Sequence, residues 1–258
     1  MKNLIKDIKN EFNNKENSVI IILYILSFIV VFFLVNEIID KNISNILICI
    51  LTLILFLIPS VVSIKLKLLF PPMSEIIIYI LIFSAQILGE VLGFYVRIEI
   101  FDTILHLLYG FVMTLIGFSL INIFYKSGKI KFKNSYKYFL LFGFCYGMTS
   151  GISWEMLEYS VDKIFNQDMQ DDTIITEISS IKFNKNNDTK PKTIEIESLI
   201  VNGEDYMKEY NGYIDIGLND TMKDIIFNLI GGIIFLIMGY NYLKGKCKVV
   251  NKLMIKKG

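Results

Sequence analysis

The sequence predicts an all-α polytopic membrane protein, with about six transmembrane helices and a small extracytoplasmic β-hairpin cap between the fifth and sixth. Hydrophobic residues make up 53% of the 258 residues, and the mean hydropathy is +0.53. The apolar residues fall in long blocks, with most charged residues gathered between them. This composition and blocky pattern are typical of integral membrane proteins rather than soluble domains.

Six apolar stretches are long enough, or nearly so, to cross a hydrocarbon layer, which takes about 20 helical residues. They are residues 19–35, 43–63, 76–96, 101–125, 138–159 and 222–243. A small-residue cleavage site does not follow the first stretch, so we expect a retained helix and not a signal peptide. The expected segments are an N-terminal segment (1–18), five helices (19–162), a polar insertion (163–221), a sixth helix (222–243) and a basic cytoplasmic tail (244–258).

Lysine residues predict the orientation, because short cytoplasmic loops are enriched in Lys and Arg. Lysines precede the first helix, follow the second and the last, and recur in 126–137, between the fourth and fifth. In a six-helix topology these four groups lie on one side, so we expect both termini in the cytoplasm of a bacterial cell. The membrane is then the plasma membrane, and the insertion 163–221 faces outward.

The insertion carries the pattern of a β-hairpin. Residues 173–183 and 193–201 alternate in polarity, and a turn-rich stretch separates them. The net charge of +1 provides no broad basic surface for nucleic acid. The three cysteines lie outside this insertion, so the sequence predicts no disulfide framework within it. The expected surroundings are therefore a lipid bilayer and a small outer cap.

Polar residues within or beside the apolar stretches collect near the outer ends of the predicted helices. Acids in an apolar helix are costly and usually have a functional role. Several of these residues are spaced by three or four, so they share a helix face. They are Glu90 in the third stretch, Asp102 and His106 in the fourth, Glu155 and Glu158 in the fifth, and Asp220, Asp224 and Asn228 at the start of the last.

This cluster predicts a site for a divalent metal ion. Carboxylates held close together repel one another, and a cation relieves both that repulsion and the cost of desolvation. Oxygen ligands with one imidazole fit Mn, Mg, Ca, Fe or Zn. We expect Glu90 or Asp220 to act as general base for a metal-bound water. The expected metal ligands are Asp102, His106, Glu155, Glu158, Asp224 and Asn228.

Three blocks of sequence resemble the YjdF-like family of uncharacterised bacterial integral membrane proteins. They are FDTILHLLYG from Phe101, SWEMLEYSVD from Ser153 and DIGLNDTMKDIIFNLIGG from Asp215. The resemblance covers most of residues 76–232 and implies a multi-span membrane protein without a known activity. By this resemblance, the six expected metal ligands and Asp220 occupy family motif positions.

Simpler interpretations of single residues compete with the metal site. Asp102 and Asp220 also suit helix N-caps, and His106 suits a hydrogen-bonded structural role. Glu158 also suits a solvated position where its helix leaves the membrane. Asn228 also suits a hydrogen bond between helices.

Two functional hypotheses follow from the cluster. The first is a divalent-metal-dependent hydrolase or transferase acting on a lipid or cell-envelope substrate, although the chain has no HExxH, GxSxG or P-loop signature. The alternative is a non-enzymatic cation or proton-coupled transporter or sensor. A transport path normally needs polar groups along its whole length, and the inner halves of these helices have few. A third interpretation is a structural membrane scaffold.

Overall fold

The computed structural model describes all residues except 1, 131–134, 167, 185–189, 208–210 and 215–216. Most of the described residues are helical. The chain divides into two compact units. The first unit comprises Met1–Ile152 and Asp224–Gly258, and the second comprises Ser153–Lys223. The expectation of a mostly helical protein with a small β part is confirmed.

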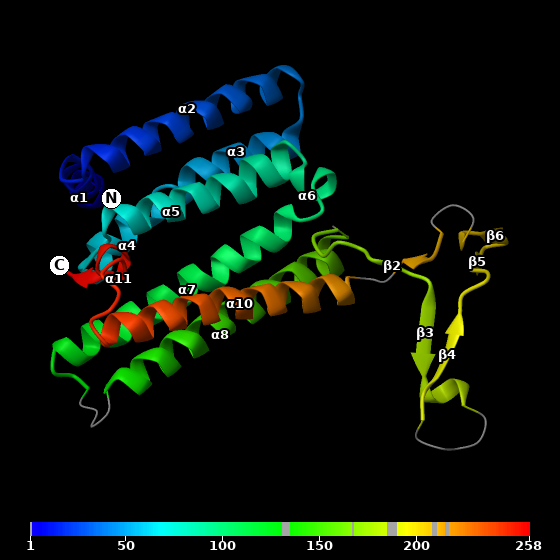
Figure 1. Ribbon diagram of the computed structural model, residues 1–258. Coiled ribbons are helices and arrows are strands. Elements are labelled where there is room, and N and C mark those ends of the chain that lie inside the picture. Colours follow the sequence, from blue (N-terminus) through cyan, green and yellow to red (C-terminus); the bar gives the residue numbers. More distant parts are fainter. Residues whose placement is uncertain (1, 131–134, 167, 185–189, 208–210, 215–216) are drawn as a thin grey trace. The chain divides into compact units, whose positions relative to one another are not determined.

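The first unit is built from helices and one short strand pair (Figure 1). Its helices are α1 (Lys2–Asn13), α2 (Asn17–Ile39), α3 (Ile43–Leu55), α4 (Ile58–Leu66), α5 (Pro72–Phe83), the π-helix η1 (Ser84–Val91), α6 (Phe94–Arg97), α7 (Phe101–Lys126), the first part of α8 (Ser135–Phe165), most of α10 (Leu218–Leu243) and α11 (Val250–Leu253). The strands β1 (Leu68–Leu69) and β8 (Lys256–Lys257) pair antiparallel.

Five helical segments among the described residues are long and apolar enough to cross a membrane. They are Asn17–Ile39, Ile43–Leu66, Pro72–Val91, Phe101–Lys126 and Leu218–Leu243. The remaining predicted stretch, 138–159, lies within α8, whose glycine, serine and glutamate residues lower its apolar character. Gly147 of α8 packs on Thr114 of α7, and Gly143 packs on Phe118, so α8 runs antiparallel to α7.

Burial differs strongly between these helices. In the apolar window of α2 only 17% of the residues are buried, against 56% in α7. Large apolar side chains of α2, including Phe28 and Phe32, are exposed. An apolar surface of this extent is unfavourable in water and is suited to lipid. The helix α7 is therefore central to the first unit, whereas α2 presents most of its surface outward.

Two hydrophobic cores hold the first unit together. One core joins α2, α3, α5 and η1 through Val19, Leu23, Val30, Cys49, Phe56, Tyr79 and Ile87. The other joins α7, α8, α10 and α11 through Leu115, Phe118, Ile121, Phe139, Phe235, Val250, Leu253 and Met254. The first unit thus consists of two helix groups, and the polar residues of α7 and α10 lie in the second.

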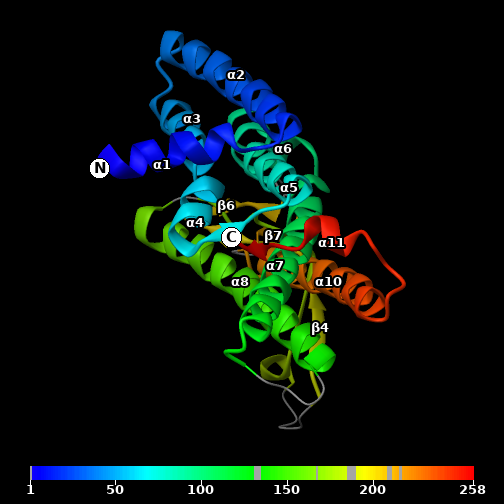
Figure 2. The ribbon, with the colours of Figure 1, turned by 90° about the vertical axis from the view of Figure 1, so that its left-hand side faces the viewer.

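The C-terminal segment folds back onto the first unit. The Ile255 amide donates to Ser119 Oγ at 3.2 Å, and the Gly258 amide donates to the Lys67 carbonyl at 2.8 Å. Strand β8 lies beside β1, near α4 (Figure 2). Leu253 and Ile255 are buried. The segment expected as a basic tail therefore contributes side chains to the core.

The second unit contains the end of α8, the start of α10 and three short strand pairs. The pairs are β2 (Ile174–Ile175) with β7 (Tyr213–Ile214), β3 (Glu177–Ser180) with β4 (Lys192–Glu195), and β5 (Ile200–Val201) with β6 (Glu204–Asp205); the 3₁₀-helix η2 (Ile181–Phe183) follows β3. The antiparallel pair β3–β4 lies in the predicted runs, except that β4 begins at Lys192, one residue before its run; residues 185–189 between the strands lie outside the described part. Asn202 and Gly203, both with positive φ, connect β5 to β6 as a two-residue hairpin turn.

Candidate metal centre

Three polar side chains of the first unit converge where α7 begins. Asp102 and His106 lie one turn apart on α7, and Asp224 projects from α10. His106 Nε2 is 3.5 Å from Asp102 Oδ1 and 3.8 Å from Asp224 Oδ2. One ligand atom from each of the three residues lies within 4.8 Å of the others. We call Asp102, His106 and Asp224 the acid–histidine trio.

The trio is largely removed from solvent. The side chain of Asp224 is 1% exposed, that of His106 8% and that of Asp102 17%. Ionised carboxylates at such positions require a compensating positive charge or hydrogen bonds. The residue preceding α7 is Ile100, which makes no side-chain cap, so Asp102 belongs to the first helical turn and is not the N-cap. The arrangement thus suits either a bound cation or a protonated imidazole.

Close contact between α7 and α10 brings His106 and Asp224 together. Gly110 lies one turn after His106, and a Cβ atom there would collide with the backbone carbonyl of Asn228. Asn228 itself lies one turn after Asp224. A Cβ atom at Gly231 would likewise collide with the carbonyl of Leu107. Small residues therefore set the spacing at which the two helices hold the trio.

Asn228 connects α10 to α8 within the first unit. Its Nδ2 donates to the Gly147 carbonyl at 3.4 Å and contacts Met148 Sδ at 3.8 Å. Its side chain occupies the position that a Cβ atom on Gly151 would take. The Oδ1 atom of Asn228 is buried and accepts no hydrogen bond from any described residue. The interhelical role foreseen for Asn228 is present, and one buried oxygen remains without a donor.

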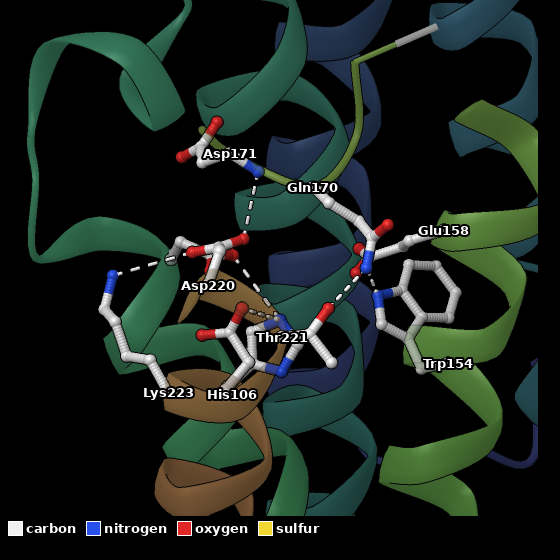
Figure 3. Close-up of polar contacts among 10 residues, drawn as sticks. His106, Trp154, Glu158, Gln170, Asp171, Asp220, Thr221 and Lys223 are labelled. Carbon is white, nitrogen blue, oxygen red and sulfur yellow. Dashed lines mark hydrogen bonds and ion pairs between the residues drawn. The ribbon is translucent and has the colours of Figure 1, made fainter. Parts of the chain in front are cut away.

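Glu155 and Glu158 belong to the second unit, on the part of α8 that follows Ile152. Both are buried. The Trp154 indole nitrogen donates to Glu158 Oε1 at 2.7 Å (Figure 3). Glu158 is therefore not a solvated surface acid, because the Trp154 indole orients its carboxylate.

Asp220 holds the beginning of the insertion to α10 inside the second unit. Its Oδ2 accepts the Asp171 amide at 3.0 Å, and its Oδ1 lies 3.8 Å from Lys223 Nζ (Figure 3). The Gln170 side chain donates to the hydroxyl of the adjacent Thr221. These contacts give Asp220 a structural role in addition to the catalytic role predicted for it.

Asp162 anchors the same loop to α8. Its two carboxylate oxygens accept the Met169 amide at 2.7 Å and the Gln170 amide at 3.0 Å. The spacing of seven and eight residues along the chain gives no periodic signal, so the sequence pattern does not predict these bonds. Glu90, the other acid predicted as a general base, is exposed near the end of η1 and is not part of the trio.

A second charged cluster, which the sequence did not reveal, lies in the first unit among α1, the residues before α2, and α5. Lys15 Nζ is 3.0 Å from Glu11 and also pairs with Glu75, and the Tyr79 hydroxyl donates to Glu75 at 2.9 Å. The side chains of Lys15 and Glu75 are 4% and 5% exposed. Their sixty-residue separation explains why local spacing did not reveal them.

Comparison with known proteins connects this chain to membrane proteins of undefined activity. The sequence profile of a family described as "Predicted membrane protein (DUF2238)" matches residues 21–245. An uncharacterised protein of Thermotoga maritima is 25% identical over 161 residues, which cover 62% of this chain and 58% of that relative. The chain thus aligns with less than two thirds of the relative's length. No solved structure matches the chain.

Proposed function

Because the chain belongs to the DUF2238 family of predicted membrane proteins, we propose that it is a divalent-metal-dependent membrane hydrolase or transferase acting on a lipid or cell-envelope substrate. The observation that carries this proposal is the acid–histidine trio of Asp102, His106 and Asp224. The likeness of three motifs to YjdF-like proteins is compatible with this membership and stays a prediction.

The charge and spacing of the trio support a divalent ion. Two carboxylates and a neutral imidazole carry a total charge of −2, which a divalent cation balances. Ligand atoms about 2.0 to 2.6 Å from one metal lie at most about 5 Å apart. The trio's atoms lie within 4.8 Å of one another, inside that limit. The unsatisfied Oδ1 of Asn228, one turn from Asp224, supplies a further oxygen nearby.

The sequence spacing keeps Glu155 and Glu158 in the proposed ligand set. The two acids are three residues apart on α8, so they share a face of that helix, and both are buried. Glu158 is the weaker member, because the Trp154 indole already donates to it.

A bound metal would polarise a substrate oxygen and lower the pKa of a coordinated water. The protein would hold that ion with buried acids and an imidazole, at the end of α7 that lies opposite its lysine-bearing end. With the lysines inside, as we propose, this end faces the outer leaflet of a bacterial plasma membrane, where lipids and envelope precursors are accessible. Glu90 and Asp220 remain the predicted general bases.

The alternative function is a cation or proton-coupled transporter or sensor. Its supporting observation is that His106 Nε2 lies within 4 Å of two different carboxylates. A protonated imidazole at these distances forms an ion pair with each acid, so the trio would carry a proton in place of a metal. A structural scaffold, in which the trio only joins helices, is the third alternative.

Metal analysis of the purified protein tests the proposal. We would measure Mn, Zn, Mg, Fe and Ca in detergent-purified protein by elemental mass spectrometry, for the wild type and for His106→Ala and Asp224→Asn. The control is Asp40→Asn, which removes an exposed acid elsewhere. We expect the wild type and the control to retain about one ion per chain, and both trio variants to lose it. Wild-type protein that holds no metal after loading with each ion would contradict the proposal and favour the protonated trio.

A further inference from the structure

A cavity of about 360 Å³ lies between the C-terminal end of α7 and strand β8, within the first unit. Three lysines line it: Lys126 from α7, and Lys256 and Lys257 from β8. The polar side chains of Asn122 and Ser127 also line the cavity, and Ile123 and Ile255 give it an apolar wall. We call this cavity the basic pocket.

The packed C-terminal segment builds the basic pocket. Asn122 is 9% exposed, and its Nδ2 donates to Met254 Sδ at 3.3 Å, which leaves a second amide hydrogen for another acceptor. The Ile255 amide is held by Ser119 Oγ, and β8 is held by β1. Hydrogen bonds, together with the buried side chains that precede β8, therefore keep its two lysines beside Lys126.

The charges of the basic pocket are not balanced by acids. No acidic residue lines it, and no ion pair joins Lys126, Lys256 or Lys257 to an acid in the part of the chain that the structure describes. Three ammonium groups around one cavity repel one another, and an anion inside relieves that repulsion. A cavity of this volume is also in the usual range for small-ligand sites.

The position of the basic pocket along α7 indicates which anion is available. Asn122 lies about 20 residues from Asp102, or ~30 Å along the helix, which is about the thickness of the hydrocarbon core. The basic pocket and the trio are thus at opposite ends of one span. We propose that the basic pocket binds the phosphate of an anionic phospholipid headgroup, with Ile123 and Ile255 contacting its glycerol portion. This inference does not depend on the proposed metal chemistry.

Binding of short-chain lipids to the full-length protein tests the assignment. We would titrate detergent-purified protein with short-chain phosphatidylglycerol and, separately, phosphatidylcholine, and measure affinity by thermophoresis and stoichiometry by native mass spectrometry. We expect saturable binding of one phosphatidylglycerol, and no saturable binding of phosphatidylcholine. The triple variant Lys126→Gln, Lys256→Gln and Lys257→Gln should weaken binding by about tenfold or more.

The matched control removes the same charge from the same region. Lys246→Gln, Lys248→Gln and Lys252→Gln alter three exposed lysines of the C-terminal segment that do not line the basic pocket. We expect this variant to bind phosphatidylglycerol within about twofold of the wild type, apart from weak surface attraction. Equal weakening in both triple variants would overturn the proposal, because it would show diffuse surface charge and no defined site.

A titration with inorganic phosphate tests whether the basic pocket binds the phosphate of a lipid headgroup or free phosphate from solution. If phosphate alone binds more tightly than the lipid, and the pocket lysines are required, the basic pocket is a phosphate site served from solution. If phosphate only displaces the lipid at high concentration, the headgroup is the ligand. Equal binding of both lipids, or no lysine-dependent binding of either lipid or phosphate, would reject the basic pocket as an anion site.

Discussion

His106 Nε2 lies 3.8 Å from Asp224 Oδ2, although the two residues are on different helices and more than a hundred positions apart in sequence. The contact depends on the next helical turn, where Gly110 of α7 touches the backbone of Asn228 of α10. Helices separated by larger side chains would hold an imidazole and a carboxylate too far apart to share one ion. The close helix contact at Gly110 therefore sets the distance between His106 and Asp224.

Gly110→Ala should disrupt the trio without altering any member of it. The added Cβ would meet the backbone carbonyl of Asn228, which cannot move without shifting α10. We expect lower thermal stability and about tenfold weaker metal binding, because the separation between His106 and Asp224 increases. Differential scanning fluorimetry and metal titration in detergent measure both effects.

Gly239→Ala is the matched control on α10. Its nearest neighbours are side-chain atoms of Leu140, Phe235 and Phe118 at 3.3 to 3.7 Å, which can adjust. Alanine also favours a helix over glycine by about 1 kcal/mol. We expect unchanged or slightly higher stability and unchanged metal binding. A Gly110 variant that behaves like this control would show that helix spacing does not govern the site.

Trp154→Phe should remove the hydrogen bond to Glu158 and keep an aromatic ring at this position. Phenylalanine keeps an aromatic side chain but cannot donate to Glu158 Oε1, whose bond to the indole is 2.7 Å long. A charge-assisted bond of this kind contributes about 1.5–3 kcal/mol. We expect a lower melting temperature and, if Glu158 ligates the metal, an altered metal affinity. Tyr159→Phe, five residues after Trp154 on α8, removes the hydroxyl of an exposed side chain and should change neither quantity.

Local spacing predicted part of the candidate site. Asp102 and His106 are four residues apart, so any helix through them places both on one face. Local spacing alone did not place Asp224 in the candidate site. That step also required the predicted topology, because the direction predicted for each span puts the starts of α7 and α10 at the same end. The structure brings these three residues together, as that topology implies.

Contacts that depend on chain folding, and not on local spacing, were not predictable. Lys15 and Glu75 pair over sixty residues, and neither lies in a pattern that identifies its partner. The basic sequence after residue 243 resembles a solvated tail, yet its few apolar residues, such as Leu253, complete a core. The β5–β6 turn did carry a signal, since Asn202-Gly203 is a typical two-residue hairpin sequence.

Asp162→Asn should loosen the start of the insertion. The Asp162 carboxylate accepts two backbone amides, from Met169 and Gln170, and the neutral amide is a weaker acceptor with only one oxygen. We expect faster hydrogen exchange at these two amides by about tenfold, measured by mass spectrometry of the intact protein in detergent. The control is Asp205→Asn, whose carboxylate accepts the amides of Leu199 and Met207 elsewhere in the insertion.

The control Asp205→Asn should leave hydrogen exchange at Met169 and Gln170 unchanged and should raise it at the amides of Leu199 and Met207. The Asp220→Asn variant should raise exchange at Asp171, because Asp220 accepts that amide. Uniform faster exchange across residues 163–172 in every variant would indicate global loosening of the insertion and would contradict separate anchors.

Leu253→Ala should destabilise the first unit although it alters a segment that follows the last transmembrane helix. Leu253 is 2% exposed and packs in the core with Phe118, Phe235 and Met254. Truncating a buried leucine to alanine costs about 2–5 kcal/mol, so we expect a clearly lower melting temperature in detergent. Val249→Ala is the control, because Val249 is 44% exposed and lies outside that core. If both variants melt like the wild type, the C-terminal segment does not complete the core. If Leu253→Ala also weakens phosphatidylglycerol binding, the same packing positions Lys256 and Lys257.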